Sequence, residues 1–138
     1  MSKTRILIVD DEISFTRLLK LNLESTGKYL VQEENVGLNG LATAREFKPD
    51  LIFLDVMMPG ADGGDLAARM RENRVLKDTP IVFLTAAVKK KEIDSRGGMI
   101  GGFPYLAKPV DLDEIVACIE RRLAPPASPL PGGSTTKD

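Results

Sequence analysis

Residues 51–60 read LIFLDVMMPG: four consecutive apolar residues are followed by an acid, Asp55, and the stretch closes on a Pro-Gly turn. The breaker pair Pro49-Asp50 precedes it. An unbroken apolar run of this length is typical of a strand buried on both faces, as in the middle of a parallel sheet. Open α/β sheets bind ligands beyond the carboxyl ends of such strands, so Asp55 is the first candidate for chemistry. The alternative is that Asp55 only caps the turn.

The same alternation of strand and helix runs along the chain as a βα unit repeated five times. Expected strands cover residues 5–9, 29–34, 51–54, 80–84 and 103–107, and expected helices cover residues 14–26, 39–47, 65–73 and 111–123. A basic segment and four glycines between residues 88 and 102 predict a short helix and a long flexible loop. Strands that alternate with helices imply a parallel sheet covered on both faces.

Length and charge exclude several classes of protein. The 138 residues suffice for one domain with a hydrophobic core, and the formal charge of −1 gives no general attraction to nucleic acid or to an anionic membrane. The single cysteine, Cys118, lies in a helical pattern and is expected to be a buried small hydrophobe. No apolar run could cross a membrane and no signal-peptide pattern is present, so a soluble cytoplasmic protein is expected.

The carboxyl ends of parallel strands share one edge of the sheet, so polar residues at those ends should gather. They are Asp10, Asp11, Asp55, Thr85 and Lys108. Clustered carboxylates repel one another and need a positive charge, and oxygen ligands without histidine favour Mg²⁺. A carboxylate nucleophile, a metal, a lysine and a hydroxyl are what phosphoryl transfer to an aspartate requires. Singly, each residue could be a helix cap, a turn residue or a solvated side chain. Together, at successive strand ends, they favour a site.

Four stretches resemble the receiver domain of bacterial two-component response regulators, in order and spacing from about Thr4 to Leu123. They are VDDE at residues 9–12, LDVMMPGADG at 54–63, LTAA at 84–87 and YLAKPV at 105–110. The resemblance implies a flavodoxin-like, doubly wound parallel sheet of five strands in the order 2-1-3-4-5, with helices on both faces. The receiver domain would span residues 1–124. Residues 125–138 are rich in Pro, Gly and Ser and predict a disordered tail or the start of a linker.

The resemblance also implies roles for individual residues. Asp55 would accept a phosphoryl group from a sensor histidine kinase or a phosphotransfer protein. Asp11, Asp55 and the backbone carbonyl of Met57 would bind Mg²⁺ directly, and Asp10 would bind it through water. Thr85 and Lys108 would contact the phosphoryl oxygens.

Three further positions match the pattern of the family. Ala86 would leave room for the phosphoryl group, and the bond before Pro109, which follows the lysine, is typically cis. Tyr105 would be an aromatic switch that swings inward as Thr85 moves towards the phosphate. A phosphoryl group adds about two negative charges, which is enough to shift the population of a protein-binding surface.

The acidic strand ends leave three alternative functions. A Mg²⁺-dependent phosphohydrolase would use Asp55 as a transient nucleophile, but such enzymes commonly carry an acid two residues later, where this chain has Met57. A flavodoxin-like cofactor module would need a phosphate-cradling loop where Asp10-Asp11-Glu12 would repel phosphate. A receiver-like module that works without phosphorylation is the third alternative.

The expected protein is therefore a switch rather than an enzyme, with at most self-catalysed phosphorylation and dephosphorylation. Its output would be an unnamed protein or domain, and a homodimer is possible. No direct contact with nucleic acid is expected, since nothing after the last helix resembles a recognition helix.

Overall fold

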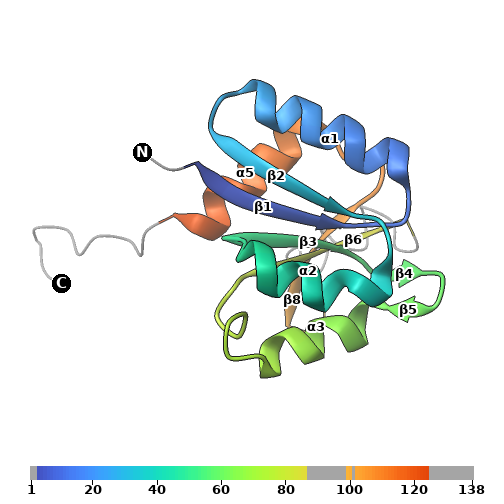
Figure 1. Cartoon of the computed structure of the whole chain (residues 1–138). Helices are drawn as coiled ribbons and strands as arrows, with labels where there is room; N and C mark the ends of the chain where they lie inside the picture. Colours follow the sequence, from blue (N-terminus) through green and yellow to red (C-terminus); the bar gives the residue numbers. More distant parts are fainter. Residues whose placement is uncertain (1–2, 87–98, 101, 125–138) are drawn as a thin grey trace, which may run out of the picture.

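A computed structural model describes residues 3–86, 99–100 and 102–124. Its centre is a sheet of six strands in the order β2-β1-β3-β6-β8-β7 (Figure 1). These are β1 (Thr4–Val9), β2 (Tyr29–Glu34), β3 (Leu51–Asp55), β6 (Ile81–Thr85), β7 (Met99–Ile100) and β8 (Phe103–Ala107). All neighbours pair in parallel except β7, which pairs antiparallel with β8. The predicted parallel sheet with the order 2-1-3-4-5 is confirmed, and β7 extends it by one short strand.

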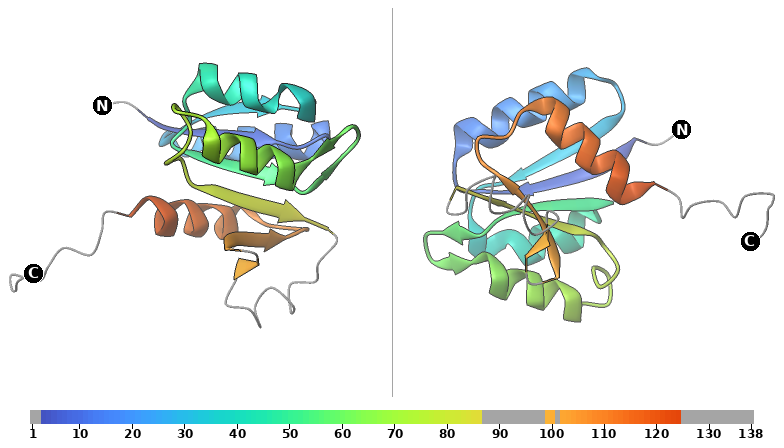
Figure 2. Two further views of the ribbon diagram at one scale, coloured as in Figure 1. Left: turned by 90° about the horizontal axis from the view of Figure 1, so that it is seen from below. Right: turned by 180° about the vertical axis from the view of Figure 1, so that it is seen from behind.

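Two hydrophobic cores lie on opposite faces of the sheet. Helices α1 (Ile13–Ser25) and α5 (Leu112–Leu123) cover one face, and α2 (Gly40–Phe47) and α3 (Gly63–Glu72) cover the other (Figure 2). In β1, Ile6 and Ile8 pack towards α1 and α5, whereas Leu7 and Val9 pack towards α2 and α3. Successive strand residues point to opposite faces, so burial of both faces requires an unbroken apolar run. Each fully buried side chain of this kind contributes about 1.5–3 kcal/mol.

Helix α3 starts two residues earlier than predicted. Asp62 is its N-cap: Oδ1 accepts hydrogen bonds from the backbone amides of Gly64, at 2.7 Å, and Asp65, at 3.3 Å. The helix therefore begins at Gly63 instead of Asp65. The prediction was wrong because two consecutive glycines have poor helix propensity, and the cap compensates for them.

The starts of α5 and α1 differ in their capping. Asp111 and Glu114 form a capping box at the start of α5, whereas α1 has no side-chain cap. Helix α1 begins at Ile13, one residue before its expected start at residue 14, and Leu18, whose spacing fits an apolar helical stripe, is 61% exposed. Cys118 is buried as predicted, and burial raises the pKa of its thiol. Among the described residues, no helix is long and apolar enough to cross a bilayer.

The segment before β8 is described only in part. The helix and loop expected between residues 88 and 102 lie mostly outside the described residues, as do residues 125–138. Within the described part, β7 pairs with the start of β8, Met99 with Pro104 and Ile100 with Phe103. Pairing of β8 with β6 begins only at Tyr105. Pro104 thus precedes the parallel ladder, as the missing amide of a proline requires.

Side chains cover part of the free edge of β2. Lys20 donates from Nζ to the Val31 carbonyl at 2.6 Å, and Glu24 Oε2 accepts the Val31 amide at 2.9 Å. The Gln32 side-chain amide donates to the Glu33 carbonyl at 3.0 Å. The hydrogen bond from Val31 lowers the pKa of Glu24, opposed by partial burial and assisted by Lys20. We call these three hydrogen bonds, made by the side chains of Lys20, Glu24 and Gln32 to the β2 backbone, the β2 edge cover.

Candidate functional site

Two acids of the predicted cluster are buried at neighbouring strand ends. Asp10 follows β1 and is fully buried, and Asp55 ends β3 and is 6% exposed. Asp11, the next residue in the chain after Asp10, is exposed. Carboxylate oxygens of the three residues all lie within 4.8 Å of one another. The parallel pairing of β1 with β3 therefore brings the acids together, as the sequence predicted.

Amide groups orient the two buried acids. The backbone amide of Glu12 donates to Asp10 Oδ1 at 2.9 Å, and the Asn35 side chain donates to the Asp10 carbonyl at 2.7 Å. The backbone amide of Met57 donates to Asp55 Oδ1 at 3.3 Å. Each carboxylate thus has one oxygen bound to backbone, and its Oδ2 atom turns towards Lys108.

Lys108 is the cation of this cluster. Its Nζ lies 2.6 Å from Asp10 Oδ2, 2.7 Å from Glu12 Oε1 and 3.8 Å from Asp55 Oδ2, and 4.8 Å from the centre of the Phe15 ring. The side chain is only 10% exposed. Sequence reasoning missed Glu12 and Phe15 as partners. The acidic run at residues 10–12 carried the signal for Glu12, but the direction of a long lysine side chain cannot be read from sequence.

The cluster contains more acidic groups than basic ones, and the pKa values of Asp55 and Lys108 are both raised. The pKa of Asp55 is raised to about 6, mainly by burial and also by the charges of Asp10 and Asp11, against the opposing effects of Lys108 and the Met57 amide. Burial by itself would lower the pKa of Lys108, but its contacts with Asp10 and Glu12 outweigh burial, so this pKa is raised. One ammonium therefore faces more negative charge than it can compensate.

The ends of β6 and β8 bring the remaining predicted residues to the same edge. Thr85 ends β6 and is buried, and Ala86 after it is exposed. The Lys108 amide donates to the Thr85 carbonyl at 2.9 Å, which ties the two strand ends together. The bond between Lys108 and Pro109 is cis, and Pro109 itself is exposed.

Tyr105 lies in the middle of β8, which β6 separates from β3, the strand that ends in Asp55. Its ring centre is 4.9 Å from that of Phe83 on β6, and Phe103 contacts the same Phe83 ring edge-on at 5.0 Å. Tyr105 is half-buried, and this burial raises the pKa of its hydroxyl. Phe83 thus connects the predicted switch residue to β6, the strand that ends in Thr85.

The backbone of α3 packs directly against the acceptor strand at Gly63. The Gly63 amide donates to the Val56 carbonyl at 2.9 Å. A Cβ atom on Gly63 would collide with the Asp55 carbonyl oxygen and lie 2.8 Å from Val56 Cα. No flexible side chain can yield there, because both neighbours are backbone. A residue without a side chain is therefore required at this position.

We expect Gly63→Ala to lower the free energy of unfolding by about 1–3 kcal/mol, since backbone must shift to admit the methyl group. Urea unfolding measures the change. Gly64→Ala, one residue later in the same helix, meets only the Asp62 side chain, at 3.1 Å, and should change stability by less than about 1 kcal/mol. Equal losses in the two variants would contradict the close approach of backbones.

The donor set of the cluster suits a hard divalent cation. Asp10, Asp11 and Asp55 offer carboxylate oxygens, the chain contains no histidine, and Cys118 is buried in the hydrophobic core below α1 and α5. Oxygen-only ligands of this kind favour Mg²⁺ over zinc or copper. The excess negative charge around Lys108 gives such a cation an electrostatic reason to bind.

Comparison with known proteins gives one consistent family. A sequence model described as response regulator receiver domain matches residues 6–120. The DNA-binding dual master transcriptional regulator RpaA of Synechocystis is 38% identical over 119 residues, covering 86% of this chain and 48% of the relative. The transcriptional regulatory protein ResD of Bacillus subtilis is 38% identical over 123 residues, covering 88% of this chain and 49% of the relative. The chain thus spans about half the length of these curated relatives.

Solved structures agree with the sequence relatives. The chemotaxis protein CheY4 of Vibrio cholerae superposes with a TM-score of 0.74 and 29% identity, covering 88% of this chain and 100% of that one. A second structure is the receiver domain of a sensor histidine kinase from Pseudomonas aeruginosa, which has a magnesium ion coordinated in its active site cleft. It gives a TM-score of 0.71 at 26% identity, covering 87% of this chain and 97% of that one. With the matching family model and the acid cluster at the strand ends, these likenesses show that the chain belongs to the response regulator receiver domain family.

Proposed function

We propose that this receiver domain is phosphorylated on Asp55 by a sensor histidine kinase or a phosphotransfer protein. One observation carries the proposal: the Asp55 carboxylate is nearly buried beside Asp10, with Oδ2 3.8 Å from the ammonium of Lys108. Its raised pKa, about 6, still leaves the nucleophilic carboxylate form predominant at pH 7. A buried nucleophile next to a cation is the arrangement that acceptance of a phosphoryl group needs.

Mg²⁺ would be the cofactor of this transfer. Asp11, Asp55 and the backbone carbonyl of Met57 would hold it directly, and Asp10 would bind it through water. When bound, the ion would neutralise charge on the carboxylates and on the phosphoryl oxygens. Support comes from the spacing of the acids and from the magnesium described in the Pseudomonas receiver domain.

The transfer itself is a simple exchange of bonds. A carboxylate oxygen of Asp55 bonds to phosphorus while the bond from phosphorus to the donor imidazole nitrogen breaks, and the electron pair leaves on that nitrogen. Lys108 and the Thr85 hydroxyl would contact the phosphoryl oxygens. Ala86 is small enough to leave room for them, and Pro109 shapes the loop that carries Lys108.

Phosphorylation would then act as a switch. The phosphoryl group adds about two negative charges, and these attract Thr85 and Lys108. As Thr85 moves, Tyr105 would turn inward beside Phe83, which its ring already contacts. The changed surface would bind an output protein or domain, or a second copy of the chain, rather than nucleic acid directly. The activity is that of a switch, with at most self-catalysed phosphorylation and dephosphorylation.

The test is the intact mass of the native chain and of Asp55→Asn after incubation with acetyl phosphate and Mg²⁺. We expect the native chain to gain one phosphoryl group that is stable to acid and labile to base, and the variant to gain none. No gain in a native chain that binds Mg²⁺ would support a module that works without phosphorylation. Sustained release of phosphate from small phosphate esters would support a phosphohydrolase instead.

A further inference from the structure

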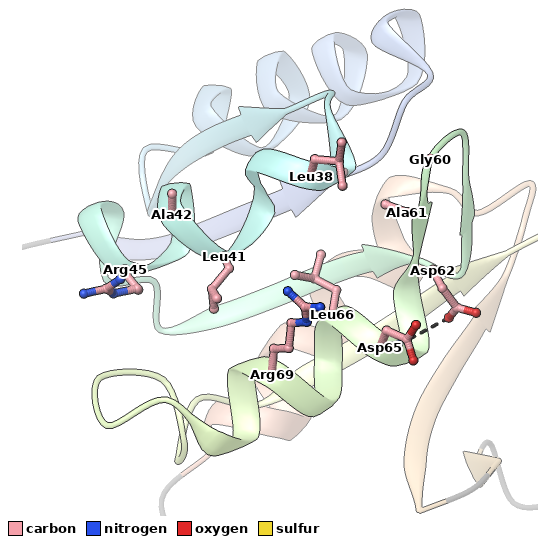
Figure 3. Close-up of a pocket in the computed structure, with 11 residues that line it drawn as sticks. Leu38, Leu41, Ala42, Arg45, Gly60, Ala61, Asp62, Asp65, Leu66 and Arg69 are labelled. Carbon is pink, nitrogen blue, oxygen red and sulfur yellow. Dashed lines mark hydrogen bonds between the residues drawn. The ribbon is translucent and has the colours of Figure 1, made fainter.

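An apolar groove of about 350 Å³ lies between α2, α3 and the hairpin formed by β4 (Met57–Met58) and β5 (Ala61–Asp62) (Figure 3). Leu41 and Leu66 line it, half-buried and buried respectively. Leu38, in the short helix η1 (Gly37–Asn39) before α2, also lines the groove and is 76% exposed. Covering this apolar surface would be favourable, because it would remove leucine side chains from water.

The walls of the groove are firmly packed against each other. A Cβ atom on Gly40, the first residue of α2, would lie 2.7 Å from Leu66 Cδ2. A Cβ atom on Gly37 would lie 2.5 Å from the Cβ of Ala61 in the hairpin. Only glycines permit this close approach, so the groove is a formed feature of the fold. It is not a gap between loosely held segments.

Opposite charges mark the two ends of the groove. Asp62 and Asp65 stand at the start of α3, whereas Arg45 and Arg69 come from the later turns of α2 and α3 (Figure 3). Both arginines are exposed, and neither forms an ion pair with another described residue. Figure 3 places Arg45 at the end of the groove far from Asp62 and Asp65, and the Arg69 side chain in the middle, between Leu41 and Leu66.

We propose that this groove docks an amphipathic helix of a partner protein, antiparallel to α2 and α3. Protein helices commonly carry acids in the first turn and bases in the last turn, where they complement the helix dipole. An antiparallel occupant places its acidic first turn beside Arg45, its middle within reach of Arg69 and its basic last turn beside Asp62 and Asp65. Its apolar stripe covers Leu38, Leu41 and Leu66. Residues 38–45 rise about 10 Å along the groove, so two to three turns of the partner suffice.

Other occupants fit the charges less well. The acids Asp62 and Asp65 at one end would repel the backbone of a nucleic acid. A free anion would use the arginines and leave the leucines uncovered. A second copy of this chain would present the same concave groove, and two grooves face to face leave the apolar channel unfilled. A separate helix fills the channel and pairs both ends.

The test uses two stapled helical peptides of about 14 residues with the same composition. Both carry leucines at helical spacing. One has glutamates in its first turn and lysines in its last, and the other has these charges exchanged. Stapling on the outer face is needed because isolated helices of this length are marginal in water. Titration into the full ¹⁵N-labelled chain, followed by NMR, gives the dissociation constant and the residues contacted.

We expect the peptide with the acidic first turn to bind about tenfold more tightly than its exchanged partner, with shifts on α2, α3 and the hairpin. Arg45→Glu combined with Arg69→Glu should remove this preference. Arg17→Glu, an exposed arginine on α1 across the sheet, is the matched control and should leave it unchanged. Absence of binding, equal binding of the two peptides, or shifts on α1 and α5 would overturn the proposal. So would concentration-dependent shifts of the groove residues without peptide, which would indicate a second copy.

Discussion

Replacing Lys108 with methionine should lower the free energy of unfolding by about 3–5 kcal/mol in metal-free buffer. Among the described residues, Lys108 is the only cation within ion-pair distance of Asp10 and Asp55. Methionine is unbranched and keeps most of the length and apolar character of the lysine stem, but it removes the charge. The fully buried carboxylate of Asp10 then loses its cationic partner, which costs much more than loss of a surface ion pair.

Mg²⁺ should reverse much of this loss, because a dication among Asp10, Asp11 and Asp55 supplies the missing positive charge. Urea unfolding with EDTA and with Mg²⁺ measures both effects. Lys28→Met, at an exposed lysine outside the cluster, is the matched control and should change stability by no more than about 0.5 kcal/mol in either buffer. An equally small change for Lys108→Met in EDTA would show that Lys108 does not hold the cluster together.

Asp55→Asn should make the metal-free protein about 2–3 kcal/mol more stable at pH 7. The pKa of Asp55 is about 6 in the folded chain, above its ordinary value of 3.8. Between these two values the folded state keeps a proton that the unfolded state has lost, so stability falls as the pH rises. A pKa higher by about two pH units corresponds to about 3 kcal/mol, all of which is lost above pH 6. The asparagine side chain of the variant carries no charge, so it avoids the loss of stability that the buried carboxylate causes.

The pH dependence distinguishes this cause from a change in packing. We expect the stability difference between Asp55→Asn and the native chain to be small near pH 4 and to grow until about pH 6. Mg²⁺ should reduce or reverse it, because only the native carboxylate is a good ligand. Asp78→Asn, at an exposed acid, should show no such growth. A difference that stays constant from pH 4 to pH 8 would contradict the electrostatic explanation.

The sequence predicted the parallel sheet because its strands carry a strong local signal. The runs around Leu7, Phe53 and Val82 are apolar without interruption, which only burial on both faces explains. Once the strands are parallel, their carboxyl ends must share an edge. The placement of Asp10, Asp55 and Lys108 at one edge therefore followed from topology alone, although the direction of the lysine side chain did not.

Features that depend on few residues or on side-chain direction could not be predicted. The β4–β5 hairpin and β7 have strands of two residues, too short for any periodicity. Leu18 fits a helical stripe by spacing, yet it points to solvent because α1 packs over the sheet through Leu19 and Leu23. The contact of Glu12 with Lys108 joins residues 96 positions apart and rests on side-chain torsions that no sequence pattern specifies.

The β2 edge cover affects whether this domain aggregates at high protein concentration. An open strand edge is a template on which identical chains can add to one another and grow into fibres. Here the central amide and carbonyl of the edge are already bound by Lys20 and Glu24. Polymerisation through β2 would first have to break these bonds and separate the ion pair of the two side chains, which are 3.4 Å apart. Two surface residues thus hinder this domain from assembling through the β2 edge of its sheet.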